Sequence, residues 1–166
     1  MDEPPNPNDP RTTRAANRAT WLAHPNAAGP AGTLLHIHDQ FHAAAERLAF
    51  LLAREIGPDL GWVARAFRPL AQTLHHHHHA EEAMLFPLVE RQTAVAPAQL
   101  VSDHEELTRA IDEVEESLAG TDKARATAAV ATFAEVLVTH LDREEELVIP
   151  VLLSMTPAEA WAMFQG

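Results

Sequence analysis

The sequence predicts an all-α protein, an up-down-up-down four-helix bundle with a flexible Pro-rich N-terminal arm and a short C-terminal helix. Glycine is sparse, with 6 residues among 166, and runs of β-branched residues are short. Four stretches carry apolar residues at the spacing of amphipathic helices, three and four residues apart. The connections between them are short, which favours antiparallel neighbours. The length suits a single domain with a sizeable core.

Composition restricts the partners and the kinds of site. The net charge of −12 argues against nucleic acid or an anionic membrane as a partner. The absence of cysteine excludes disulfides, iron–sulfur clusters and thiolate zinc sites, so any metal site must use histidine and carboxylate. No apolar run approaches the roughly 20 residues of a membrane span. The N-terminus lacks the features of a signal peptide, so a cytoplasmic protein is expected, with its oligomeric state open and a monomer compatible.

Residues 1–30 are predicted to form the arm. Six of the 12 prolines fall in this segment. Because proline interrupts helices, no long helix is expected here, and the segment should dock loosely if at all. Trp21 and Leu22 are its expected anchors, covering one end of the bundle.

The first bundle helix is expected over about residues 33–56, ended by Gly57-Pro58. His38 falls on its apolar stripe and should point inward, and His42, one turn later, could join it. An inward histidine alone is more often a core residue than a metal ligand.

The second bundle helix is expected over about residues 60–91, with a bend at Pro69. The third follows Pro97 and runs to about Leu118. The fourth covers about residues 123–147.

Pro150 is predicted to end the fourth bundle helix. The bundle domain as a whole is predicted to cover residues 31–153. Residues 154–166 are predicted to form the short C-terminal helix, which opens with a capping box from Thr156 to Glu159 and should pack across the end of the bundle.

An unusual pattern occurs twice, from His77 to Pro87 and from His140 to Pro150. Both stretches read His-x-x-x-Glu-Glu-x-x-apolar-apolar-Pro, and the first lies in a run of five histidines. Residues four apart share one face of a helix, so each first histidine stands over the first glutamate. Imidazole beside carboxylate suits iron, zinc or manganese.

The predicted topology brings these residues to one depth in the bundle. His38 and His77 lie about equally far from the first turn, and His104 is matched with His140 across the last. Burying such groups without a metal would cost several kcal/mol in desolvation. Two metals bridged by carboxylates would leave room for a substrate, whereas one six-coordinate metal would not. The first-choice ligands are His38, His77, Glu81, His104, His140 and Glu144.

Over about residues 33–153 these motifs resemble the hemerythrin-like, HHE cation-binding family. The resemblance rests on the histidine motifs of the four helices in this order, together with the two Glu-Glu pairs. It implies a non-haem di-iron centre, two Fe ions with an oxo or hydroxo bridge, inside a four-helix bundle. The implied terminal ligands are His38, His77, His104 and His140, and the implied bridges are Glu81 and Glu144.

His78 is a further implied ligand, because some members of the family use the residue after the histidine of the second helix. Oxygen-carrying hemerythrins have another histidine one turn after that of the third helix, and this chain has Thr108 there. Thr108, or a water in place of the missing ligand, is therefore expected to open the site to peroxide. The chain contains no tyrosine, so a tyrosine ligand is excluded.

The function expected from the resemblance is the binding or processing of dioxygen or hydrogen peroxide at this centre. The alternatives are a peroxide-decomposing oxidoreductase and an iron-storage or buffering protein. His75, His76 and His79 are expected on a solvated face, with metal sequestration as the other interpretation. Glu82, Glu145 and Glu146 are expected to be exposed, or to orient ligating histidines, rather than to bind metal.

Overall fold

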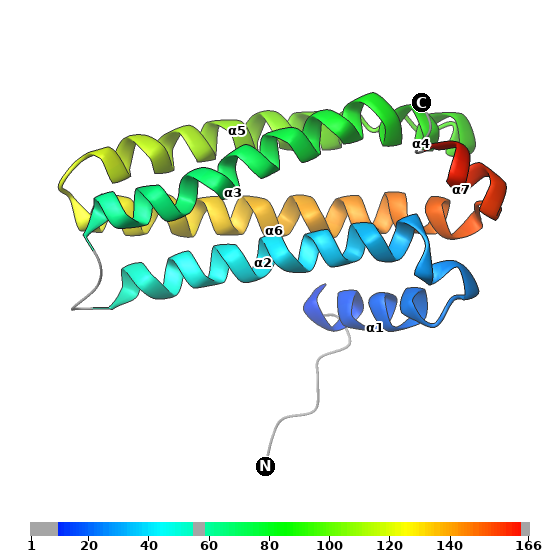
Figure 1. Cartoon of the computed structure of the whole chain (residues 1–166), viewed down its shortest axis with the longest axis horizontal. Coiled ribbons are helices and arrows are strands. Elements are labelled where there is room, and N and C mark those ends of the chain that lie inside the picture. Colours follow the sequence, from blue (N-terminus) through cyan, green and yellow to red (C-terminus); the bar gives the residue numbers. More distant parts are fainter. Residues whose placement is uncertain (1–9, 55–58, 164–166) are drawn as a thin grey trace, which may run out of the picture.

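The computed structural model describes residues 10–54 and 59–163, and all of the regular secondary structure within these ranges is helical. This confirms the all-α prediction. Four long helices lie lengthwise beside one another (Figure 1), and they are α2 (Pro30–Ala53), α3 (Leu60–Ala80), α5 (Ala98–Ala119) and α6 (Lys123–Ser154). The shorter elements are α1 (Pro10–Leu22), the 3₁₀ turn η1 (Pro25–Ala28), the π turn η2 (Glu81–Leu85), α4 (Phe86–Thr93) and α7 (Pro157–Met163).

Local sequence signals fix where the long helices begin. Pro30 occupies the first turn of α2, where its missing N–H is not needed. Asp59 caps α3 by accepting from the Trp62 N–H at 2.8 Å, and Asp122 caps α6 by accepting from the Ala124 N–H at 2.9 Å. The expected end of the first bundle helix at Gly57-Pro58 lies outside the described residues.

The apolar core consists of two clusters of buried side chains, one toward each end of the bundle. In α2, His38 lies between Leu35 of one cluster and Phe41 of the other. In α6, Glu144 lies between Leu141 and Val148 in the same way. The polar residues of interest therefore lie between two apolar layers.

The N-terminal segment differs from the prediction. Residues 10–22 form α1, a regular helix that contacts α6. The prolines lie outside the stretch from residue 11 to residue 24, and this stretch contains enough alanine and arginine to favour a helix. Trp21 packs against the cluster at its end of the bundle, as expected, but Leu22 is 57% exposed and anchors nothing.

The two repeated motifs also differ from simple expectation. The helix predicted over residues 60–91 is interrupted by the π turn η2, and α4 continues it to Thr93. The prediction that Pro150 ends the fourth helix is wrong, since α6 continues to Ser154. Burial of Val151 and Leu152 in the core offsets the hydrogen bond that Pro150 cannot make.

The short helix α7 opens with the expected capping box. The Thr156 N–H donates to Glu159 Oε2 at 2.7 Å, and the Glu159 N–H donates to Thr156 Oγ1 at 3.3 Å. Residues 164–166 of the predicted C-terminal helix lie outside the described residues. Among the described helices, none has the length and apolarity needed to span a membrane.

Candidate metal centre

The seven residues singled out from the sequence converge in two groups between the apolar clusters. Within each group the candidate ligand atoms lie within 4.8 Å of one another. The first group contains two histidines and two glutamates, and these are His38, His77, Glu81 and Glu144. The second group contains three histidines, His78, His104 and His140. The residues come from α2, α3, η2, α5 and α6, so only the folded bundle assembles them.

Glu81 and Glu144 join the two groups. Glu81 Oε1 lies 2.7 Å from His77 Nε2, while its Oε2 lies 3.4 Å from His104 Nε2. Glu144 Oε2 lies 3.4 Å from His38 Nε2 and 3.5 Å from His140 Nε2. Each carboxylate therefore faces a histidine of both groups, which is the arrangement that a bridge between two metal ions requires.

His78 gives the second group its third histidine. Its ring stacks on that of His104 with centroids 4.0 Å apart, and its side chain is 4% exposed. The Thr108 hydroxyl donates to the backbone carbonyl of His104 at 2.9 Å. That Thr108, or a water beside it, opens the site to peroxide stays a prediction.

Within residues 10–54 and 59–163, most of the buried side-chain nitrogen and oxygen atoms that lack a hydrogen-bond partner belong to these seven residues. They include the Nε2 atom of every histidine in the two groups and all four oxygens of the two glutamates. A buried polar group without a partner costs about 1–3 kcal/mol, and a domain is stable by only about 5–15 kcal/mol. The cluster thus fits bound cations, which would satisfy these atoms together.

The pKa values of the five histidines shift in two directions, down for three of them and up for the other two. Burial lowers the pKa of His77 and His140 to about 4 and that of His78 to about 2, so these rings are neutral, as metal ligands must be. For His38, the Glu144 and Glu145 carboxylates overcome burial and raise the pKa to about 9. Glu81 and Glu82 likewise overcome burial and raise the pKa of His104.

The pKa values of the two central carboxylates shift in opposite directions. Burial and the neighbouring Glu144 raise the pKa of Glu81 to about 8. Burial acts on Glu144 in the same direction, but the His38 imidazole outweighs it and the pKa of Glu144 is lowered. Two adjacent buried carboxylates cannot both ionise easily without a cation. A cation bound between them would allow both carboxylates to ionise.

The second glutamate of each repeat contacts the Nδ1 atom of a candidate histidine ligand. Glu145 Oε1 lies 3.1 Å from His38 Nδ1, and Glu82 Oε1 lies 2.7 Å from His104 Nδ1. A carboxylate on Nδ1 fixes the tautomer and turns Nε2 toward the site. These contacts are the ones expected of glutamates that orient metal-binding histidines. Their surroundings differ, since the side chain of Glu145 is 1% exposed and that of Glu82 is 43% exposed.

Two arginines of α1 reach the buried glutamate, and sequence reasoning missed them. Arg18 Nη1 donates to Glu145 Oε1 at 2.6 Å, and Arg14 Nη2 donates to the same oxygen at 3.3 Å. Arg14 Nη2 also lies 2.6 Å from Nε2 of His42, which is outside both groups. The available signal was the spacing of the two arginines, four apart in a stretch without proline.

Asp103 was also missed. It is buried, holds an ion pair with Arg143, and places Oδ2 3.8 Å from His140 Nδ1. Apart from its position beside His104, no feature of the sequence distinguishes it.

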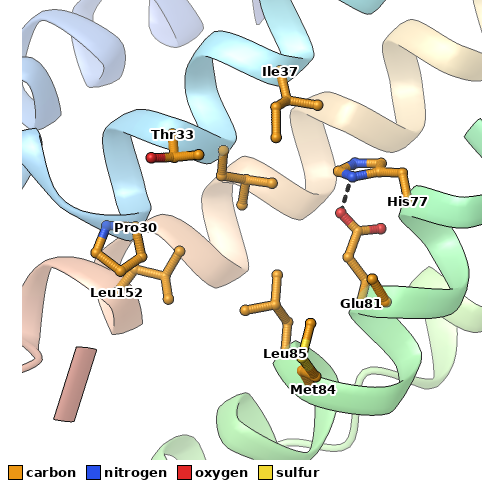
Figure 2. Close-up of a pocket in the computed structure, with 10 residues that line it drawn as sticks. Pro30, Thr33, Ile37, His77, Glu81, Met84, Leu85 and Leu152 are labelled. Carbon is orange, nitrogen blue, oxygen red and sulfur yellow. Dashed lines mark ion pairs between the residues drawn. The ribbon is translucent and has the colours of Figure 1, made fainter. Parts of the chain in front are cut away.

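An apolar pocket leads to the first group. Figure 2 shows His77 and Glu81 pointing toward each other on one side of this pocket, with Pro30 and Leu152 lining the other. The cavity has a volume of about 150 Å³. Its size suits a molecule of a few atoms. Three further histidines of the run, His75, His76 and His79, are exposed, as predicted.

Comparison with known proteins gives one match. The family model described as the hemerythrin HHE cation binding domain matches residues 33–152. No curated protein and no solved structure matches the chain. The matched segment contains all seven residues of the two groups and begins after α1.

Proposed function

Because the chain belongs to the hemerythrin HHE cation-binding family, we propose that it holds a pair of iron ions that bind or process dioxygen or peroxide. The observation that carries this proposal is the cluster of unpartnered imidazole and carboxylate atoms buried between two apolar layers. Histidine with carboxylate, and without cysteine, is a donor set that suits iron.

We assign the ligands from the two groups. His38 and His77 would hold one ion, and His78, His104 and His140 would hold the other, with Glu81 and Glu144 shared. The distances from each glutamate to histidines of both groups support this division. Successive long helices alternate in direction in Figure 1, which supports an up-down-up-down bundle around the centre.

An iron pair can supply two electrons to dioxygen or exchange them with peroxide. The protein's part is to leave room on one side and to exclude water. The first group has one histidine fewer than the second, and the apolar pocket reaches this group at His77 and Glu81. Phe41 packs against the His77 ring with centroids 5.0 Å apart and closes the inner side. This arrangement favours a small uncharged ligand on the His38–His77 side.

The apolar lining of the pocket supports dioxygen, a small uncharged molecule, as the ligand of the first group. Reversible change of the absorption spectrum with dioxygen would support binding. Evolution of oxygen from added peroxide would support turnover instead. Iron bound well beyond two ions per chain would favour storage.

The first test is metal content per chain, by elemental analysis of untagged protein from iron-replete medium. We expect about two irons per chain, as a two-ion site of this family requires. His140→Ala should lose at least one ion, while the matched variant His76→Ala, at an exposed position of the histidine run, should keep both. Full retention of both ions in His140→Ala would sink the ligand assignment.

A further inference from the structure

We infer that α1 is part of the metal centre, in which Arg14 and Arg18 are positioning residues that hold Glu145 against His38. This inference rests on the proposed metal site. It extends the centre beyond the matched residues 33–152 to the segment that precedes them. The two arginines would act through Glu145 and would not touch a metal ion.

Arg18 ties α1 to two helices at once. Its Nη1 contacts Glu145 of α6 at 2.6 Å, and its Nη2 contacts Asp39 of α2 at 2.6 Å. Asp39 is the neighbour in sequence of His38. A planar guanidinium can serve two carboxylates in fixed directions, which a single lysine ammonium does less well. Arg18 therefore sets the spacing between the helix that carries His38 and the helix that carries Glu145.

Arg14 closes the same site from the preceding helical turn. Its Nε pairs with Asp142 at 2.8 Å, and its Nη2 approaches both Glu145 and Nε2 of His42. Burial and the Arg14 charge lower the pKa of His42 to about 4, so its ring is neutral and accepts from the arginine. Each side-chain contact of Arg14 thus restrains the arginine beside Glu145.

The burial of Glu145 explains why cations are needed here. A carboxylate that is 1% exposed and lacks a cation would be strongly destabilising, because little water reaches it. Its Oε1 already lies at His38 Nδ1, so a shift of the carboxylate would release the His38 ring. On the other side of the centre, Glu82 is 43% exposed and is solvated directly. The structure thus shows why only one side requires the arginines.

The expected consequence is selective. Without Arg18, the affinity for the ion held by His38 and His77 should fall. The affinity for the ion held by the three-histidine group should fall less. Loss of a group that orients a metal-binding histidine typically lowers affinity about 10–100-fold.

The test uses full-length protein loaded with Co²⁺, whose absorption spectrum reports ligand geometry, and competition with a chelator. Arg18→Ala should release one of two ions about 10–100-fold more readily and change the spectrum. Arg18→Lys should restore only part of the wild-type behaviour. Arg125→Ala, which removes an exposed ion pair with Glu113 and Glu116, is the matched control and should behave as wild type.

Wild-type affinity and spectrum in Arg18→Ala would overturn the inference while leaving the proposed function in place. If the wild type binds no ions, both fall together. If Arg18→Ala does not fold, Asp39→Asn carries the test, since it removes the exposed anchor of Arg18 and leaves Glu145 intact. An unchanged ion affinity and spectrum in a folded Asp39→Asn would then overturn the positioning role of Arg18.

Discussion

The two repeated motifs have the same pattern over eleven positions but form different structures. The motif from His77 to Pro87 passes through a π turn, uses two adjacent histidines, and leaves its second glutamate exposed. The motif from His140 to Pro150 stays α-helical, contributes one histidine, and buries its second glutamate under α1. Local sequence determines which residues face inward. The neighbouring helices determine how each outer carboxylate is compensated.

The largest loss of metal should come from changes to the two glutamates that face both groups. Glu144→Gln and Glu81→Gln each remove a carboxylate that faces both groups, so each should lose both ions, whereas His140→Ala loses at least one. Each ion present at about 1,000 times its dissociation constant adds about 4 kcal/mol of stability, or roughly 8–16 °C in Tm for a chain of this size. Elemental analysis with thermal unfolding measures both effects. Retention of both ions in either variant would contradict the bridging role.

The next effect is the pH dependence of metal affinity, which reports the protonation of His38 and Glu81. The pKa of about 9 for His38 and about 8 for Glu81 mean that both groups hold a proton at pH 7 in the metal-free chain. Because metal must displace these protons, affinity should rise with pH, by up to about two decades per unit below pH 8.

Above pH 8 the Glu81 proton no longer has to be displaced, so the rise in metal affinity should become shallower. In the metal-free protein, the folding stability changes with pH in the opposite direction, so it falls as the pH rises. The stability that His38 contributes is complete below pH 6.5 and is lost as the pH rises through about 9. Titration of divalent-metal affinity, with measurement of proton release, checks this. An affinity that does not change from pH 6 to 8 would show that these two protons are absent.

The smallest effect should separate the outer carboxylates. Glu145→Gln removes a buried charge held by two arginines, and we expect about 10–100-fold weaker metal binding. Glu82→Gln removes an exposed charge that lies 2.7 Å from His104 Nδ1, and water can replace it, so the loss should be smaller, roughly a few-fold. Chelator competition on the two variants gives a direct comparison. Equal losses would show that burial and the arginines do not distinguish the two sides.

The sequence predicted the inward histidines and glutamates correctly for a clear reason. The spacing of four residues is a local property, and the equal distances of His38 and His77 from a turn follow from antiparallel helices. The structure brings these residues together as expected. The role of His78 came from the family resemblance and not from spacing, because adjacent residues point about 100° apart on a regular helix.

What the sequence did not predict depends on contacts between distant segments. The prolines around α1 concealed a regular helix, and its two arginines have meaning only beside the buried Glu145. Continuation of α6 past Pro150 depends on burial of the following residues, which is a property of the assembled core. The π turn has no strong sequence preference, and it became visible only in the structure.

The π turn also determines how each motif tolerates a change in length. A π turn is an α-helix with one residue inserted, so deletion of the exposed Ala83 could return η2 to α-helical geometry without displacing Phe86 or Val89. Deletion of the exposed Glu146 in α6 has no such reserve, and would rotate Val148 and all that follows by about 100°. Of the two motifs, only the first can lose a residue while keeping its core in register.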